Sequence, residues 1–217
     1  MKTIIYIDGQ NFLYKAAERL IDAGVVTDKQ AVTSIDFPYL FSQIVPHLQP
    51  EIRFYGVKKI KRQTRFGADI KRKSVQFANN LRRVRSCLQK TGVKFCATGT
   101  LKVRDRDQCK QCGATDYKYQ EKGVDVGLAV DIVNDVLTKQ TDHVILVSSD
   151  TDLIPAIKIA KAHHAQLTYV GFNHQLTKAI SKLADSTKII HGRNLITAYE
   201  RLNPPHRPFT SNSPQTP

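Results

Sequence analysis

The sequence predicts an α/β protein with a mainly parallel sheet. Short runs of apolar and β-branched residues alternate along the chain with longer segments of helical periodicity. The run at residues 144–148 contains four aliphatic residues and a serine, a composition typical of a strand buried on both faces. Asp150 and Asp152 follow it directly. Ligands of open α/β sheets bind beyond the carboxyl ends of the strands, so these aspartates stand where a functional site is expected.

The size and charge of the chain limit the class of protein. A chain of 217 residues suits one domain with an elaboration or with a small second domain. The net charge of +14 favours a polyanionic partner, either nucleic acid or an anionic membrane surface. The sequence has no apolar run that could span a bilayer, and its start is too short in apolar residues for a signal peptide. Four cysteines without such a signal do not indicate a disulfide framework, so we expect a cytoplasmic protein.

The first half of the chain is predicted to contain three strands and three helices. Residues 2–7 form the first strand, which ends on Asp8, and Gly9 allows a tight turn into a helix at 11–21. A loop at 22–36 leads into a helix that Pro46 interrupts. The remaining elements expected here are this second helix at 37–48, strands at 51–57 and 93–97, and a helix over 74–88.

In the second half, residues 121–138 give the clearest helical pattern. Apolar residues recur every four positions and form a buried stripe: Val124, Leu128, Ile132 and Val136. A strand at 144–148, a helix at 153–163, a strand at 166–172, a helix at 173–184 and a short strand at 189–190 are expected to follow. The proline-rich segment 203–217 is predicted to be a disordered tail.

Aspartates at the ends of buried strands are the first candidates for function. Asp8 ends the first strand as Asp150 ends the later one, and Asp125 lies near the start of the clearest helix. Carboxylates grouped in this way suit a hard divalent cation such as Mg²⁺ or Mn²⁺. The alternative is structural: Asp152 or Thr151 would cap a helix, Asp150 would occupy a turn, and Asp8 would be a cap or turn residue together with Asn11.

Two further acidic residues are weaker candidates. On a helix at 121–138, Glu121 and Asp125 would share a face near the amino-terminal end. Asp131, six residues beyond Asp125, would be rotated away from it by roughly 120°. We expect both Glu121 and Asp131 at the rim of the site at most, and neither as a direct metal ligand.

The positive charge is concentrated in residues 58–94. This block holds thirteen basic residues and one acidic residue, a net +12 of the chain's +14. Its alternative role is a solvated helix face, and Phe66 and Phe77 within it are expected to pack in the core rather than stack on bases. The concentration of charge favours a nucleic-acid-binding surface. Its candidate contacts are Arg62, Arg65, Lys71, Arg72, Lys73, Arg82, Arg83 and Arg85.

Cys109 and Cys112 form a C-x-x-C-G sequence within the segment 100–120. The pair is half of a tetrahedral site for a structural Zn²⁺ ion, and a second pair at standard spacing is missing. A redox motif of the thioredoxin type is not expected, because no strand precedes the pair and no helical pattern starts there. The ligands that could complete a zinc site are Cys87, Cys96, His163, His164 or the cysteines of a second subunit in a homo-oligomer.

Three stretches of the chain resemble the signature blocks of the NYN domain. They are IIYIDGQNF, EKGVDVGLAVDI and VILVSSDTDLIPAI, in this order. The NYN domain is a PIN-like nuclease group that includes the LabA-like proteins, and the similarity extends over residues 1–191. The block 58–94 would be a basic insertion in this domain, 100–120 a further segment outside the core motifs, and 192–202 a C-terminal extension.

The resemblance implies a fold and a site. The fold would be a Rossmann-like, PIN-like three-layer sandwich with a mainly parallel sheet, and the site a metal-dependent ribonuclease centre. By position, the acidic cluster of the family corresponds to Asp8, Asp125, Asp150 and Asp152. The supporting residues would be Asn11, Ser148 and Ser149.

The chemistry of the residues agrees with an endoribonuclease that uses Mg²⁺ or Mn²⁺, because phosphodiester hydrolysis needs an activated water and charge relief on the leaving oxygen. The alternative is an RNA-binding protein of the same fold without catalysis. A phosphohydrolase of the haloacid dehalogenase type would need D-x-D-x-T after the first strand, where Asp8 is followed by Gly9, Gln10 and Asn11. A topoisomerase-primase domain would need a glutamate after its first strand, where this chain has Asp8. Membrane-surface binding would need an amphipathic stretch with a bulky apolar face, which the sequence lacks.

Overall fold

The computed structural model describes residues 2–29, 32–60, 68–105, 117–173 and 176–204. Arg62, Arg65, Phe66, Cys109 and Cys112 lie outside these ranges, as does nearly all of the segment predicted to be a tail. Within the described ranges, no helix is both long and apolar enough to cross a membrane.

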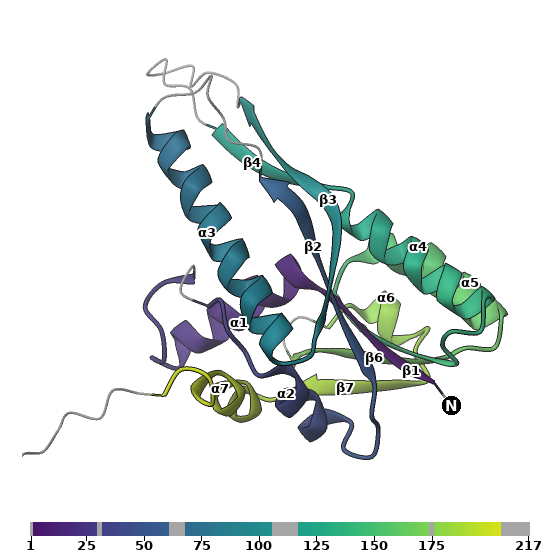
Figure 1. Cartoon of the computed structure of the whole chain (residues 1–217). Helices are drawn as coiled ribbons and strands as arrows, with labels where there is room; N and C mark the ends of the chain where they lie inside the picture. The colour runs from purple at the N-terminus through teal and green to yellow at the C-terminus, as the bar shows by residue number, and fades with distance from the viewer. Residues whose placement is uncertain (1, 30–31, 61–67, 106–116, 174–175, 205–217) are drawn as a thin grey trace, which may run out of the picture.

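A seven-stranded sheet runs through the described part of the chain in the order β4-β3-β2-β1-β5-β6-β7 (Figure 1). Every neighbouring pair is parallel except β3 and β4, which are antiparallel. Apart from the added edge strand β4, this is the order of doubly wound dinucleotide-binding sheets. The strands are β1 (Thr3–Asp8), β2 (Glu51–Ile60), β3 (Lys94–Asp105), β4 (Tyr117–Lys122), β5 (His143–Val147), β6 (Gln166–Phe172) and β7 (Ser186–Ile190).

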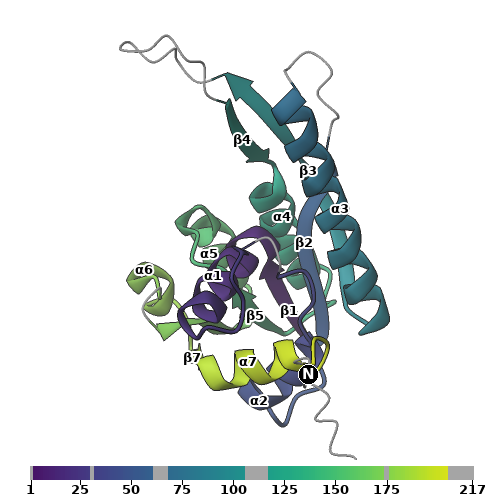
Figure 2. The same cartoon turned by 90° about the vertical axis from the view of Figure 1, so that its left-hand side faces the viewer.

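Helices cover both faces of the sheet and complete a three-layer sandwich, which confirms the predicted fold class (Figures 1 and 2). One face carries α1 (Gly9–Asp22), α2 (Phe37–Ile44), α3 (Ala68–Lys90) and α7 (Gly192–Glu200). The other carries α4 (Val124–Leu137), α5 (Ile154–Ala162) and α6 (Lys178–Ser181), with the short 3₁₀ turn η2 (Thr151–Leu153) before α5.

The alternation of side chains along the central strand divides the core into two layers. In β1, Ile5 and Ile7 point into the core under α1, α2 and α7, while Ile4 and Tyr6 point into the core under α4 and α5. All four side chains are almost completely buried. This explains why the first strand reads as continuously apolar rather than alternating.

Gly9 permits the sharp start of α1 directly after β1. A Cβ atom at this position would lie 2.1 Å from a ring carbon of Phe54 and 2.4 Å from the carbonyl oxygen of Tyr55. These distances are far below van der Waals contact. Glycine at this position therefore brings the first turn of α1 against β2 and fixes the direction in which Asp8 points.

The helix predicted at 121–138 begins later, at Val124, and the prediction that Glu121 and Asp125 share a helix face is wrong. Glu121 lies on β4, a strand that the sequence did not predict, and pairs with Leu101 of β3. Gly123 separates strand from helix with a left-handed backbone (φ 85°), which glycine adopts without strain. The apolar stripe that predicts the helix begins at Val124, so the pattern itself gives no reason to start the helix at residue 121.

The other departures concern the lengths and ends of elements. β3 continues well past residue 97, the helix expected at 37–48 ends at Ile44, and the one expected at 173–184 is reduced to α6. Helix α7 was not predicted at all. It buries Leu195 and Ala198 in the same core layer as α1 and α2, so the segment expected as an extension contributes to the fold.

Candidate active site

The order of strands creates a crevice beside β1. From β1 the chain continues to β2 and β3 on one side, and it later returns to β5 on the other side. The carboxyl ends of β1 and β5 therefore border the topological switch point, where ligands of such sheets bind. Asp8 is the last residue of β1, and Asp150 follows β5 by three residues.

Asp8 is buried and held at both carboxylate oxygens. Its Oδ1 accepts a hydrogen bond from the backbone N–H of Asn11 (3.1 Å), and its Oδ2 accepts one from the hydroxyl of Ser148 (2.9 Å). The first of these bonds caps α1, so the structural role predicted as an alternative is present. It does not compete with a functional role, since the cap fixes the carboxylate at the edge of the sheet.

Ser148 connects Asp8 with Asp150. The Ser148 hydroxyl donates to Asp8 and accepts from the backbone N–H of Asp150 (3.1 Å). Asp150 Oδ1 in turn accepts from the backbone N–H of Asp152 (2.9 Å), so Asp150 caps η2. The cap of this segment is thus Asp150, and not Thr151 or Asp152 as the structural alternative proposed. Asp152 is exposed at the mouth of the crevice.

Asp125 and Glu121 bring further negative charge to the same place. Burial raises the pKa of Asp8, and the charges of Asp125 and Asp150 raise it further. Burial, followed by Asp8 and Asp125, raises the pKa of Glu121 to about 7. The pKa of Asp125 is also raised, first by burial and then by Asp150 and Asp152. Asp8, Asp125 and Asp150 therefore lie close enough to repel one another. Glu121 repels the first two of them, and Asp152 repels Asp125.

The structure brings together the four aspartates singled out in the sequence, Asp8, Asp125, Asp150 and Asp152. It also adds Glu121 to them, which had been expected only at the rim, because β4 carries this side chain to the site from the edge of the sheet. Asp131 lies elsewhere, between the sheet and α4, where it accepts a hydrogen bond from the Tyr55 hydroxyl (2.8 Å).

Sequence reasoning missed one basic residue of the site. The Lys15 ammonium group donates to the Ser149 hydroxyl, which also accepts from the Asn11 side-chain amide (3.1 Å). Burial lowers the pKa of Lys15, and the charge of Asp8 opposes this shift. Lys15 follows Asn11 by four residues on α1, and this spacing was the available signal that both share one face.

The donor set suits a hard cation. Carboxylate and hydroxyl oxygens are ligands that Mg²⁺ and Mn²⁺ prefer, and Mg²⁺ is commonly held by one or two carboxylates while water and substrate phosphate complete its shell. Among the described residues, no three His, Cys, Asp or Glu side chains are arranged to hold a metal ion by themselves.

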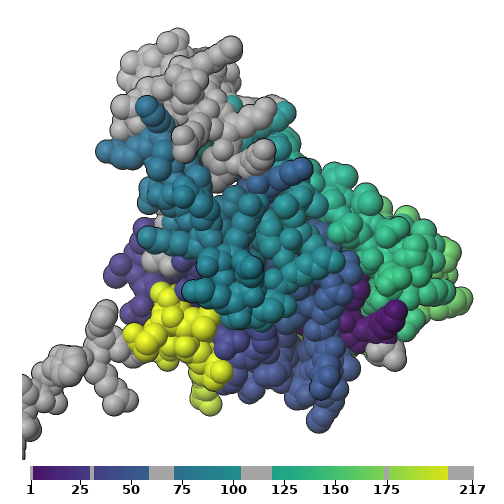
Figure 3. Space-filling model, in the orientation of Figure 1, coloured from purple at the N-terminus to yellow at the C-terminus, as the bar shows by residue number. Residues whose placement is uncertain are grey.

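The basic block, residues 58–94, includes the end of β2, the whole of α3 and Lys94, the first residue of β3. Figure 3 shows α3 and the adjoining strands across the middle of one face of the molecule. Arg85 turns inward: it donates to the carbonyl oxygens of Val57 (2.9 Å) and Lys58 (2.8 Å) and lies 4.4 Å from the ring centre of Phe95. The predicted contacts that are exposed on α3 are Lys71, Arg72, Lys73, Arg82 and Arg83.

The fold and the acidic edge define an α/β protein of the PIN-like type. The chain belongs to the NYN domain family, whose model matches residues 2–191 and whose members are generally nucleases. The resemblance seen in the three sequence motifs is thereby confirmed.

The chain is also similar to individual proteins of known sequence or structure. The 6-hydroxy-3-succinoylpyridine 3-monooxygenase HspA of Pseudomonas putida is 27% identical over 179 residues, which cover 75% of this chain and 56% of that protein. The chain thus spans little more than half the length of this relative. A crystal structure of a Vibrio parahaemolyticus protein of unknown function is 19% identical with a TM-score of 0.53, covering 88% of this chain and 93% of that one. This likeness supports the fold alone.

Proposed function

We propose that the protein is a metal-dependent endoribonuclease that hydrolyses RNA phosphodiester bonds at the carboxylate cluster. The observation that carries the proposal is the group of carboxylates at the switch point, where burial and then the charges of neighbouring carboxylates raise the pKa of Asp8, Asp125 and Glu121. A folded protein gains no stability from such repulsion, and a divalent cation relieves it. Membership of a family that is generally nuclease supports the same reading.

The residues of the chain divide the work of such a reaction. Mg²⁺ or Mn²⁺ would be held by carboxylates from the set Asp8, Asp125, Asp150 and Asp152 together with water and substrate phosphate. When bound, the ion supplies Lewis acidity and a more acidic water. Ser148 and the N–H of Asn11 fix the orientation of Asp8, so this carboxylate is preorganised.

Two further side chains suit charge and proton handling. Lys15 is oriented by Ser149 at the crevice and would approach a negatively charged phosphate. Glu121, with a pKa of about 7, exchanges a proton near neutral pH and suits general acid–base work.

RNA would be held by the exposed cations of α3. The acidic cluster repels phosphate by itself, so affinity has to come from elsewhere on the molecule. Phosphate contacts release counterions, and log affinity should fall by roughly 0.7 per contact with log salt for a single strand.

Zn²⁺ bound through Cys109 and Cys112 stays a separate proposal, because both residues lie outside the described ranges.

The decisive experiment compares Asp150→Asn with Asp142→Asn on a pool of labelled RNAs in Mg²⁺, Mn²⁺ or EDTA. Asp142 is exposed before the opposite end of β5, where it accepts from the backbone N–H of Lys2, and an asparagine keeps that acceptor oxygen. We expect Asp150→Asn to reduce cleavage by at least about 100-fold while RNA affinity stays equal or rises slightly. Asp142→Asn should behave as wild type.

Full cleavage by Asp150→Asn with Mn²⁺ would reduce Asp150 to a cap and contradict the proposal. Tight RNA binding by wild type without cleavage in either metal would instead support the second candidate, an RNA-binding protein without catalysis. That candidate rests on the exposed basic residues of α3, which would bind RNA whether or not the protein cleaves it.

The RNA surface is tested by salt dependence. Replacing Arg82 and Arg83 by glutamine should flatten the slope of log affinity against log salt by about 1.4 if both touch phosphate. The matched control replaces Lys158 and Lys178, which are exposed on α5 and α6 over the other face. Arg85 is left intact because its contacts with Val57 and Lys58 hold α3 against β2. If the slope of log affinity against log salt is unchanged in the α3 variant, Arg82 and Arg83 are solvated and do not contact phosphate.

A further inference from the structure

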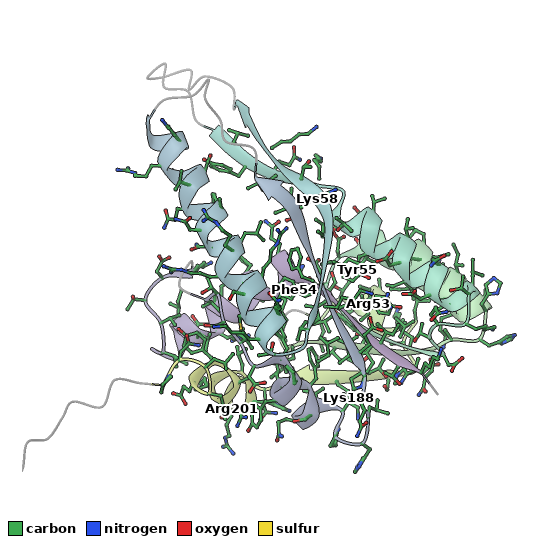
Figure 4. All side chains as sticks on the ribbon, viewed as in Figure 1. Arg53, Phe54, Tyr55, Lys58, Lys188 and Arg201 are labelled. Carbon is green, nitrogen blue, oxygen red and sulfur yellow. The ribbon has the colours of Figure 1, made fainter. Side chains whose placement is uncertain are left out.

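A pocket of about 290 Å³ opens between α1, α3 and the sheet. Its walls combine aliphatic, polar and aromatic side chains. The aromatic ones come from elements far apart in the sequence and include Phe54 of β2, Phe95 of β3, Phe77 of α3 and Tyr119 of β4. Phe54 and Phe95 are stacked at 6.2 Å with an interplanar angle of 25°, and Phe77 meets Tyr119 edge-on at 4.9 Å. Figure 4 shows Phe54 on the α3 side of the sheet.

The pocket adjoins the carboxylate cluster through two of its lining residues. Glu121 lines the pocket and also repels Asp8 and Asp125. Gly9, which lines it too, directly follows Asp8 in the chain. A ligand bound in the pocket would therefore adjoin the place where a scissile phosphate has to lie.

We propose that this pocket receives one unpaired base of the RNA substrate, turned out of its stack, so that the neighbouring phosphate is presented to the carboxylate cluster. The inference rests on the proposed function and names a determinant of its substrate. RNA that is read by proteins is mostly single-stranded, with splayed bases stacked on aromatic side chains.

Charge and chemistry favour a base of a polynucleotide over another occupant. The helix that supplies Phe77, Leu81 and Val84 to the pocket carries exposed Lys71, Lys73, Arg82 and Arg83 on its surface, so a polyanion bound there passes beside the opening. A purely apolar ligand would not use the polar side chains that line the pocket. Among these, Gln10, Thr33 and Glu121 carry hydrogen-bonding groups suited to the edge of a base.

The pocket can be filled without opening the core. Leu81 lies on α3, is only partly buried and lines the pocket, so Leu81→Trp should occupy its volume. Val130→Trp is the matched control, since Val130 is 59% exposed on α4 and does not line the pocket. Phe77→Ala is a second variant that removes one wall instead of filling the space. Thermal unfolding first verifies that all three variants fold.

Binding is measured in EDTA, so that its result does not depend on cleavage. The probes are one single-stranded RNA and a set of copies, each with one abasic position. We expect Leu81→Trp and Phe77→Ala to bind the intact RNA about 10-fold more weakly, within the range typical of losing one stacked base. One abasic copy should show a similar loss with wild type and no further loss with Leu81→Trp. Val130→Trp should bind like wild type.

Equal losses of Leu81→Trp on intact and every abasic RNA, or no loss at all, would overturn the inference. The inference would also be overturned if the pocket binds a free aromatic compound instead of a base. In that case Leu81→Trp would abolish the binding of nicotinate, used as the probe, and leave RNA binding unchanged. If Leu81→Trp weakens RNA binding in a base-dependent way but wild type never cleaves RNA, the base pocket is supported and the nuclease proposal is rejected. If cleavage depends on Asp150 but Leu81→Trp leaves RNA affinity unchanged, the nuclease proposal is supported and the base pocket is rejected.

Discussion

Helix α4 carries a carboxylate near each end, and the two have opposite surroundings. Asp135 is buried toward the carboxyl end, where it receives a salt bridge from Arg53 (2.6 Å) and a hydrogen bond from the Tyr6 hydroxyl (2.8 Å). Asp125, in the first turn, faces other carboxylates, and no ion pair to it is found among the described residues. The carboxylate that the fold uses is neutralised by Arg53, and the one at the switch point lies among like charges.

This contrast separates structural from functional acidic residues better than burial does. Burial disfavours a lone charge, so a buried carboxylate normally has a partner in the protein. Asp8 is as deeply buried as Asp135, at 4% and 6% exposure, yet its nearest charged neighbours include two aspartates. Like charges retained around a buried carboxylate therefore distinguish Asp8 from Asp135, whose charge is balanced by Arg53.

The largest expected effect is on the paired carboxylate. Asp135→Ala leaves Arg53 with the more exposed Glu51 as its remaining ion-pair partner and leaves the Tyr6 hydroxyl without its acceptor, so the free energy of unfolding should fall by about 3 kcal/mol. Urea unfolding measures this change. Replacing Arg53 and Asp135 together by Met and Leu should recover much of the loss, and a single Asp135→Ala with wild-type stability would contradict the comparison.

Asp125→Asn should act on catalysis and hardly on the fold. We expect RNA cleavage to fall by about 100-fold, equivalent to about 2.7 kcal/mol of transition-state stabilisation. Without metal at pH 8, the stability should rise slightly, since one repelling charge is removed. Cleavage rates and urea unfolding of the same preparation test both statements, and a destabilised but active variant would place Asp125 with the structural carboxylates.

Divalent cations should stabilise the wild-type protein through the unpaired carboxylates. At ten times its dissociation constant, Mg²⁺ or Mn²⁺ should add about 1.4 kcal/mol to the free energy of unfolding. Asp125→Asn should lose most of this gain, while Asp142→Asn at the other edge should retain it. Thermal unfolding with and without EDTA gives the comparison, and equal gains in both variants would mean that the cation binds elsewhere.

The smallest effect is a pH dependence that comes from Glu121. Its folded pKa of about 7 lies above the ordinary value of 4.5, so the folded protein retains a proton that the unfolded chain releases between these values. Without metal, stability should therefore decrease as pH rises from 4.5 to 7. Glu121→Gln should match wild type at pH 4 and exceed it by about 1 kcal/mol at pH 8, allowing for partial exposure.

Urea unfolding in EDTA at the two pH values measures this difference. The control is Glu200→Gln, at the exposed end of α7, which should show no difference at either pH. A constant difference between Glu121→Gln and wild type at all pH values would show that the substitution acts on packing and not on charge.

The sequence by itself determined the parallel strands, the class of fold and the aspartates at the strand ends. These are local features: a fully apolar run such as 144–148 has to be buried on both faces, and parallel neighbours end at one edge. From this alone Asp8 and Asp150 could be expected to meet. The three NYN motifs added Asp125, which no local pattern would have brought to the same edge.

Only the tertiary structure decided the role of Glu121, the inward turn of Arg85, the contribution of α7 and the aromatic pocket. Each depends on pairing between distant segments. Glu121 reaches Asp8 because β4 pairs backward along β3, and residues 117–122 carry no apolar pattern that fixes this pairing in advance. The charge of Arg85 predicted a surface contact, but two carbonyl oxygens at the end of β2 lie within its reach only after α3 has packed.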